Sequence, residues 1–503
     1  MISDADWNNT LYGYPFKTEP WPHQLEEFTL YKDEPGRALL WQMRTGKTKA
    51  IIDLACYLYT TKKINRVLIL APNGVHIQWI YQELAKHMWP SVPYIGFAYV
   101  ASNRWNDEHI ANVETVCNER TGLSFLAINN ESLFVADIMG TIARFMKKKD
   151  VLGVFDESHD FRVPGSKRTK IARGIRKHLK YSRILTGSPV DNSPLHAYSQ
   201  FELVEPGCLG YDTYQSFVDN FAKYREEKTA GGRTYKVLNE FINTDQLTKA
   251  IAQHASLVLR KDVVGLPPLV HSQRTFEIGE TLAQAYKAIK EEFYLELNSG
   301  KIIDAVSGGA RLIKLQQILS GFCMDDKHEA HSLVNEDMNP RLQALAEELE
   351  GWPTSKVIIW CNFREDIRKV GSFITKKLGR PYVEYYGPIS PELRLKNLQT
   401  FQNDPLCPTF IGQPAAGGRG LDLSAAEAII WYSHTPNLII RNQANERGTK
   451  KDGRPVYVID LVARNSVDEY WLELLKDKHD LSELIARSGL REVLLDILSK
   501  DKI

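Results

Sequence analysis

Short apolar runs recur along the chain, each ending in small or polar residues and followed by a helix-like stretch. They lie at 66–72, 124–130, 151–157 and 182–189 in the first half, and at 356–362, 381–387, 409–418, 428–433 and 455–461 in the second. Such runs are typical of buried parallel strands whose carboxyl ends carry functional loops. The pattern predicts an α/β protein with two RecA-like lobes, each a parallel sheet with flanking helices.

The stretch between the two sets of runs has a different composition. Residues 206–280 are rich in aromatic and charged side chains, which favours a small helical insertion and linker. We therefore expect lobe 1 at 1–205, lobe 2 at 281–480 and an amphipathic C-terminal helix at 481–503. Residues 280–350 are expected to be mostly helical, with a break at the glycine-rich segment 307–309.

Composition narrows the class of protein. The 503 residues are 43% hydrophobic and 25% charged, which is ordinary for a soluble globular chain. No run of about 18 apolar residues suggests a membrane span, and the first residues do not resemble a secretory signal. The six cysteines form no C-x-x-C pair, which argues against a zinc site or a disulfide framework. We expect a cytoplasmic protein, and we favour a monomer.

The net charge of +1 means that any contact with nucleic acid must come from local patches. The clearest basic patch runs from Arg162 to Arg183. Within it, Lys170, Arg173, Lys177 and Lys180 fall at helical spacing and would share one face. The face is either a solvated helix surface or a contact for nucleic-acid phosphates. The neighbouring motifs favour phosphate contact.

The tripeptide Gly46-Lys47-Thr48 follows an apolar run and opens a helical stretch. A bound nucleotide needs backbone N–H groups at a helix N-terminus, a lysine at the β- and γ-phosphates and a hydroxyl on Mg²⁺. We therefore predict that Thr45, Gly46, Lys47 and Thr48 bind ATP, with Thr48 also a Mg²⁺ ligand. Trp41 stands where the full phosphate-loop pattern has its first glycine. The tripeptide alone arises often by chance, so a second signal is needed.

That second signal is the pair Asp156-Glu157 at the end of the apolar run 151–157. We expect Asp156 to hold Mg²⁺ through water and Glu157 to act as general base on the attacking water. Adjacent carboxylates after a strand also cap helices. Their occurrence downstream of the lysine motif favours catalysis.

In this order the segments resemble the motifs of superfamily 2 helicases and, among these, the Swi/Snf-type DNA translocases in a compact phage or bacterial form. The resembling segments are the glutamine motif at 21–24, motif Ia at 71–79, the DEAH-like box at 156–159, the LTGTP-like motif at 185–194, the lobe linker at 259–268, motif IV at 385–402, motif V at 416–426, motif VI at 443–450 and the closing brace at 465–470. The resemblance covers about residues 20–480.

The resemblance implies further site residues. It places Gln24 at adenine, Gly420 and Asp422 at the nucleotide, and Arg447 and Lys450 of the second lobe at the γ-phosphate. Loop residues suited to hold phosphate oxygens of the nucleic acid, or else to cap helices, are Asn73, His76, Asn130, Ser188 and Ser390.

The chain departs from the family's pattern at two positions. Arg44 stands where glycine is usual, and Lys450 stands where motif VI has its second arginine. Lysine offers a point charge without the planar fork of arginine. Lys450 is the expected second cation, with Arg441 or Arg454 as alternatives.

We therefore expect an ATP- and Mg²⁺-dependent motor that translocates on double-stranded or branched DNA without sequence preference, and remodels DNA or DNA–protein complexes. If phage-encoded, it would work in the bacterial host cytoplasm. One alternative is a strand-separating helicase acting on DNA or RNA, which requires a wedge or pin. Another is a nucleic-acid binding protein with a weakened ATP site, which rests on Arg44 and Lys450.

Overall fold

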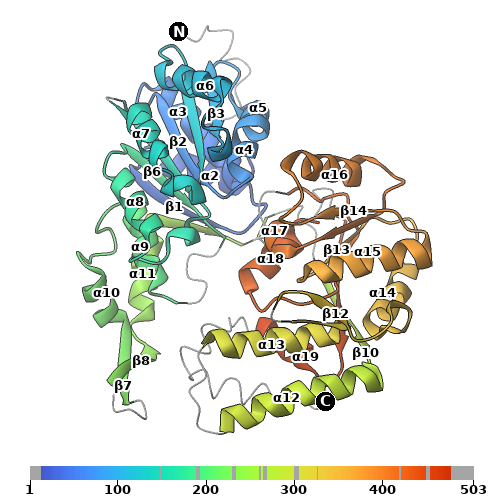
Figure 1. Ribbon diagram of the computed structural model, residues 1–503. Helices are drawn as coiled ribbons and strands as arrows, with labels where there is room; N and C mark the ends of the chain where they lie inside the picture. The colour runs from blue at the N-terminus through green and yellow to red at the C-terminus, as the bar shows by residue number, and fades with distance from the viewer. Residues whose placement is uncertain are drawn as a thin grey trace. The chain divides into compact units, whose positions relative to one another are not determined.

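The computed structural model describes residues 13–147, 149–187, 193–228, 234–259, 262–263, 269–298, 305–325, 327–417, 421–448 and 454–476. The chain divides into two compact units. Unit 1 comprises Met1–Arg225 and Asn239–Val264, and unit 2 comprises Glu226–Leu238 and Gly265–Ile503. Unit 1 runs mostly from blue to green and unit 2 mostly from yellow to red in Figure 1.

Unit 1 is built on a seven-stranded parallel sheet in the order β3-β4-β2-β5-β6-β1-β9. Its strands, in that order, are β3 (Tyr94–Tyr99), β4 (Leu123–Asn129), β2 (Arg66–Ala71), β5 (Val151–Asp156), β6 (Tyr181–Leu185), β1 (Gly36–Trp41) and β9 (Ala255–Val258). Strands β2, β4, β5 and β6 confirm the four apolar runs of the first half. Their residues are buried throughout, which explains why they are mostly apolar rather than alternating.

Helices flank this sheet (Figure 1). The helices of unit 1 are α2 (Pro22–Tyr31), α3 (Lys47–Thr60), α4 (Val75–Gln78), α5 (Leu84–His87), α6 (Asp107–Asn118), α7 (Ala136–Met146), α8 (Lys167–Arg176), α9 (His196–Val204), α10 (Tyr214–Phe221) and α11 (Thr244–His254). Helix α10 lies away from the sheet and packs against α9 (Figure 1). Between α4 and α5 the chain forms a π-helical turn, Trp79–Glu83. The apolar side of α3 packs with Trp41, Trp79 and Trp89 in one core cluster.

The stretch 206–280 differs from the expected helical insertion. Besides α10 and α11 it contains a two-stranded element, β7 (Ala222–Lys228) with β8 (Thr234–Phe241). It also supplies β9, beside β1 in the first sheet, and β10 (Leu269–Phe276), beside β17 in the second. Only tertiary pairing reveals β9, because four residues carry too little pattern to predict a strand.

Unit 2 is built on a six-stranded sheet in the order β10-β17-β16-β13-β15-β14, with every pair parallel. Its other strands are β17 (Val456–Ala463), β16 (Ala428–Trp431), β13 (Val357–Trp360), β15 (Thr409–Gly412) and β14 (Tyr382–Tyr385). These five confirm the apolar runs of the second half. With unit 1, they confirm the prediction of two α/β lobes with parallel sheets.

The helices of unit 2 are α12 (Gly279–Asn298), α13 (Ala305–Leu319), α14 (Pro340–Glu350), α15 (Arg364–Leu378), α16 (Pro391–Asn403), α17 (Pro414–Gly417), α18 (Leu438–Glu446) and α19 (Val467–Lys476). The predicted break at 307–309 is wrong, because α13 includes these residues. A short hairpin, β11 (Phe322–Met324) with β12 (Ala330–Ser332), follows α13. The expected helix at 481–503 lies outside the described residues.

Two expectations about the chain's environment can be compared with the structure. Among the described residues, no helix is both long and apolar enough to cross a membrane. All six cysteines are free thiols, four of them buried. Burial raises the pKa of the Cys56 thiol, which makes it unreactive.

Candidate nucleotide and nucleic-acid site

The loop between β1 and α3 has the backbone conformation that a phosphate loop requires. Gly46 has φ +83°, and a Cβ there would lie 2.0 Å from Nε2 of Gln24. Arg44 also has positive φ, 62°. Glycine adopts this conformation freely, whereas arginine does so at a cost. The backbone of this loop therefore gives a physical reason for the glycine that the family usually has at position 44.

Lys47 is the first residue of α3, and its side chain turns back onto the loop. Its Nζ donates to the carbonyl of Trp41 at 2.7 Å and to that of Gln42 at 3.3 Å. Thr45 is fully buried and donates through Oγ1 to the same Gln42 carbonyl at 2.7 Å. Thr48, the second residue of α3, is half-buried. The ammonium group and the free N–H groups of the first turn thus lie at one helix end.

Two side chains of α2 hold the loop from outside. Gln24 donates through Nε2 to the carbonyl of Gly46 at 3.0 Å and accepts from the N–H of Trp21 at 2.8 Å. A ring nitrogen of His23 lies 2.7 Å from the Thr45 carbonyl, and burial lowers the pKa of that ring. The glutamine predicted to read adenine therefore contacts the phosphate loop directly.

Asp156 ends β5 with both carboxylate oxygens held by donors. Oδ2 accepts from the indole N–H of Trp79 at 2.8 Å, and Oδ1 accepts from the backbone N–H of Glu157 at 3.0 Å. Burial, and next the charge of Glu157, raise the pKa of Asp156 to about 6, while Lys47 opposes the rise. Such a perturbed carboxyl group is frequent at functional sites.

Glu157 occupies the left-handed region, with φ 51° and ψ 56°. Its Oε2 lies 3.3 Å from Nδ1 of the buried His159. The next residue, Ser158, donates to Oε1 of Gln200 on α9 at 2.8 Å, which anchors this turn to the fold. Glu157 and Arg44 are thus two non-glycine residues with positive φ on the two motifs predicted for ATP.

The residues predicted to contact nucleic-acid phosphates differ in exposure. Asn73 is exposed in the turn before α4, and Ser390 is exposed and accepts from the N–H of Leu393 as the cap of α16. His76 is buried, which lowers the pKa of its ring to about 4. Asn130 is also buried and donates to Oδ2 of Asp160 at 3.1 Å. Ser390 thus caps a helix, and His76 and Asn130 pack in the interior of unit 1. Ser188 lies outside the described residues.

The predicted basic face is only partly present. Helix α8 ends at Arg176, so Lys177 is its cap and Lys180 lies beyond it. Arg173 is drawn to Oε2 of Glu202 on α9 at 2.6 Å. Lys170 and Lys177 are exposed. The structure therefore takes Lys180 off the predicted helix face and pairs Arg173 with Glu202, and contact of Lys170, Arg173 and Lys177 with nucleic acid stays a prediction.

In unit 2, Arg447 follows α18 and is buried, with its guanidinium 3.4 Å from the carbonyl of Leu421. The side chain of Asp422 is exposed and accepts from the N–H of Ser424 at 3.1 Å. Arg441 is buried, ion-paired with Asp460, and lies 4.0 Å from the Trp431 ring centroid. This core position argues against Arg441 as the second cation. Gly420 and Lys450 lie outside the described residues.

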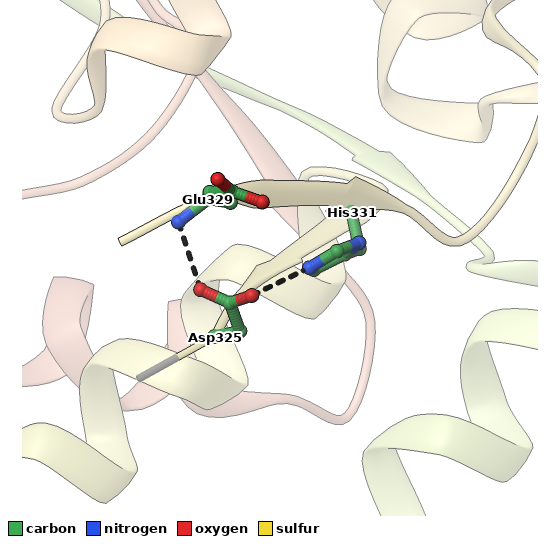
Figure 2. A group of neighbouring side chains, drawn as sticks. All are labelled: Asp325, Glu329 and His331. Carbon is green, nitrogen blue, oxygen red and sulfur yellow. Dashed lines mark hydrogen bonds and ion pairs between the residues drawn. The ribbon is translucent and has the colours of Figure 1, made fainter. Parts of the chain in front are cut away.

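A separate group of metal-ligating side chains, Asp325, Glu329 and His331, lies on the β11–β12 hairpin (Figure 2). Asp325 accepts from the backbone N–H groups of Lys327 and Glu329 at 2.9 Å each, and its second oxygen lies 2.9 Å from Nε2 of His331. These bonds close the hairpin turn. The group contains none of the residues predicted for Mg²⁺.

Comparison with protein families gives two matches. The SNF2-related domain model matches residues 28–328, and the model of the helicase conserved C-terminal domain matches residues 340–450. Together they cover every strand of the two parallel sheets except β17.

Among curated proteins, an uncharacterized ATP-dependent helicase of Mycoplasma genitalium is 23% identical over 95% of this chain and 42% of its own length. The TATA-binding protein-associated factor MOT1 of Saccharomyces cerevisiae is 24% identical over 70% of this chain and 21% of its own. Putative protein p41 of Acyrthosiphon pisum secondary endosymbiont phage 1 is 23% identical over 95% of this chain and 99% of its own. The chain thus spans less than half of the first two relatives.

Among solved structures, the SWI2/SNF2 ATPase core of Sulfolobus solfataricus in complex with dsDNA is 20% identical. It covers 97% of this chain and 98% of its own, with a TM-score of 0.41.

Proposed function

This chain belongs to the SNF2-related family, and on that premise we propose that it is an ATP-dependent motor that translocates along double-stranded or branched DNA and remodels DNA or DNA–protein complexes. The observation that carries the proposal is the meeting of two motifs in unit 1. Lys47 lies after the carboxyl end of β1, and the pair Asp156-Glu157 lies at the carboxyl end of β5 in the same parallel sheet. Ligands of open α/β sheets bind at this edge.

The side chains at this edge suit the hydrolysis of a nucleoside triphosphate. The ammonium of Lys47 can exchange its two carbonyl acceptors for phosphate oxygens, which pair more strongly with it. The carboxylate of Glu157 takes the proton of the attacking water, and His159, 3.3 Å away, orients that carboxylate. The family resemblance assigns the cation for the γ-phosphate to Arg447, and this role stays a prediction.

The same place fits Mg²⁺. Magnesium prefers oxygen ligands and keeps several waters, which agrees with a carboxylate and a hydroxyl as its protein groups. Asp156 is buried beside a second carboxylate, and a cation there would favour its charged form. Asp156 and Thr48 would hold the ion, which neutralises charge on the nucleotide's phosphates when bound.

DNA is the proposed track for two reasons. Relatives named as ATP-dependent helicases and a TATA-binding protein-associated factor match over most of this chain. The exposed groups Asn73, Lys170 and Lys177 offer donors to phosphates, which favours binding without sequence preference. The phage relative, which matches over 95% of this chain and 99% of its own length, supports a compact form working in a host cytoplasm.

The test compares steady-state ATPase rates with double-stranded DNA, forked DNA, single-stranded DNA and RNA, with Glu157→Gln as the inactive reference. We expect the largest stimulation by double-stranded or forked DNA. ATPase activity that no nucleic acid changes would contradict a motor. Stimulation by RNA alone would contradict the proposed track.

Strand separation is a second candidate because the structure contains the β7–β8 pair, a hairpin-like element of the kind that can act as a wedge. The side chain of Tyr224 on β7 is 43% exposed, and Lys223 is paired with Glu240 on β8. A triplex-displacement assay beside an unwinding assay separates the two candidates. If the wild type displaces the triplex strand but does not unwind a duplex, translocation is supported. If the wild type unwinds and Tyr224→Ala loses unwinding but keeps triplex displacement, a wedge is supported.

A further inference from the structure

The helix after β2 is interrupted near the ATP motifs. Between α4 and α5, the residues Trp79–Glu83 form a π-helical turn. Single π-turns inside helices are rare and occur frequently at functional sites. The turn begins at Trp79, whose side chain is 1% exposed and packs in the same core cluster as the apolar residues of α3.

The polar atom of Trp79 has one specific partner. Its indole N–H donates to Oδ2 of Asp156 at 2.8 Å, while the N–H of Glu157 fixes Oδ1 at 3.0 Å. A carboxylate oxygen has two lone pairs, so each oxygen of Asp156 can still accept a second donor. The two fixed donors determine the plane of the carboxylate without blocking it.

We propose that Trp79 is a positioning residue, whose indole N–H holds the Asp156 carboxylate in the orientation that receives hydrated Mg²⁺. The inference rests on the proposed function, since it assumes that Asp156 serves a metal–nucleotide site. Carboxylates that ligate metals are held by outer hydrogen bonds, and losing such a bond costs about 10- to 100-fold in metal affinity or activity. The tryptophan thereby links a buried helix to the ATP site without touching the nucleotide.

The chain offers a matched control in the same core. The indole N–H of Trp89 donates to Oδ1 of Asp53 at 2.9 Å, and both residues are buried. Asp53 is also paired with Lys49 on α3. Trp89→Phe therefore removes an equivalent indole–carboxylate bond and a similar ring volume, away from the residues assigned to Mg²⁺.

The experiment measures binding of a fluorescent ADP to the full chain without nucleic acid, as a function of Mg²⁺ concentration. We expect Trp79→Phe to raise the half-saturating Mg²⁺ concentration about 10-fold. Binding without Mg²⁺ stays unchanged. The kcat for ATP falls, while KM measured at saturating Mg²⁺ changes little. Trp89→Phe lowers the Tm to a similar extent but leaves the Mg²⁺ dependence as in the wild type.

A double-mutant cycle isolates the pair. In the Asp156→Asn background, Trp79→Phe is expected to have no further effect on the Mg²⁺ dependence of binding. If the effects of the two substitutions were instead additive, Trp79 and Asp156 would act independently of each other. Equal Mg²⁺ shifts in Trp79→Phe and Trp89→Phe would reduce the role of Trp79 to packing and overturn the inference. The inference would also be overturned if Trp79→Phe kept the Mg²⁺ dependence and kcat of the wild type while Glu157→Gln was inactive. That result would leave the proposed ATPase activity supported.

A measurement on the folded wild type covers the case in which Trp79→Phe does not fold. With ¹⁵N-labelled tryptophan, the indole resonance most displaced by Asp156→Asn identifies the N–H bound to that carboxylate. We expect this resonance to shift when MgADP is added and to shift less with ADP alone. An unchanged resonance overturns the inference.

Discussion

Single residues at the two ATP motifs are held by contacts from elsewhere in unit 1. Gly46 leaves room for Gln24, Asp156 is fixed by Trp79, and Ser158 is tied to Gln200. Positive φ at Arg44 and Glu157 is strain that the surrounding structure sustains. Fixed orientation of this kind is what a preorganised phosphate site requires.

Lys47→Ala and Glu157→Gln test the chemistry directly. Each is expected to lower ATP turnover by roughly 10²-fold or more, because one removes a phosphate contact and the other the general base. Glu157→Gln should still bind ATP, since its shape is kept. Steady-state ATPase and equilibrium nucleotide binding are the measurements. Wild-type turnover in both variants would mean that the site is elsewhere.

Arg447→Ala tests the cation of unit 2. If Arg447 acts as an arginine finger, hydrolysis is expected to fall by about 10³-fold or more, with ATP binding still measurable. Lys450→Ala should cause a smaller loss, and Lys450→Arg should preserve or raise turnover because a fork pairs two oxygens. If Lys450→Ala kept wild-type ATPase activity and Arg454→Ala lost it, the second cation would be Arg454 instead of Lys450.

Asp366 on α15 gives a prediction about stability and pH. It is fully buried, and burial raises the pKa of its carboxyl to about 6 against an opposing bond from Ser433. The folded state therefore binds this proton more tightly than the unfolded state. The protonated carboxyl therefore contributes to the free energy of unfolding below about pH 4, and this contribution is lost as the pH rises through 6. The contribution is on the order of 3 kcal/mol. The Tm of Asp366→Asn relative to the wild type should thus rise from pH 4.5 to pH 7.5. A constant difference across that range would mean that the carboxyl is charged throughout.

At the scale of elements, the site depends on where strands end and helices begin. Both ATP motifs come directly after buried strands, and α3 points its first turn at the loop. Helix α8 follows the acidic motif and presents Lys170 and Lys177 to solvent. It is the element whose role in binding is most open to test.

Replacing Lys170 and Lys177 together by alanine should weaken DNA binding several-fold at low salt, because two phosphate contacts are lost. Lys376→Ala with Lys377→Ala is the matched control, since these lysines are exposed in the last turn of α15. Binding is measured by fluorescence anisotropy with double-stranded DNA. If both double variants weakened DNA binding equally, the lysines of α8 would contribute only as general surface charge. Arg173→Ala should change binding less than the double variant, because Arg173 is paired with Glu202.

For the whole molecule, a net charge of +1 confines the attraction for DNA to local surfaces. A motor that holds phosphates should bind different DNA sequences with similar affinity. Its affinity should fall steeply with salt, by a slope of about −0.9 in log–log terms for each phosphate contact. Titrations at several salt concentrations, on two unrelated DNA sequences, are the measurement. A shallow slope with strong preference for one sequence would indicate a sequence-specific binder instead.

The sequence by itself determined nine of the thirteen described strands in the two parallel sheets, the two-lobe organisation and the order of the two ATP motifs. Apolar runs indicate strands that are buried on both faces of a sheet. Lys47 and the pair Asp156-Glu157 lie in short motifs, which can be recognised from the local sequence alone. The order of the motifs along the chain is sufficient to predict the family, because each motif occupies a fixed place relative to the strands.

Tertiary structure decided which polar side chains are available. His76 and Asn130 are buried and Arg173 is paired, because packing against other elements sets exposure and local spacing does not. Strand β9 exists through its pairing with β1, and α13 continues through Ser307–Gly309 although glycine disfavours helices. The bond from Trp79 to Asp156 joins residues 77 positions apart, a distance over which sequence pattern carries no information about contact.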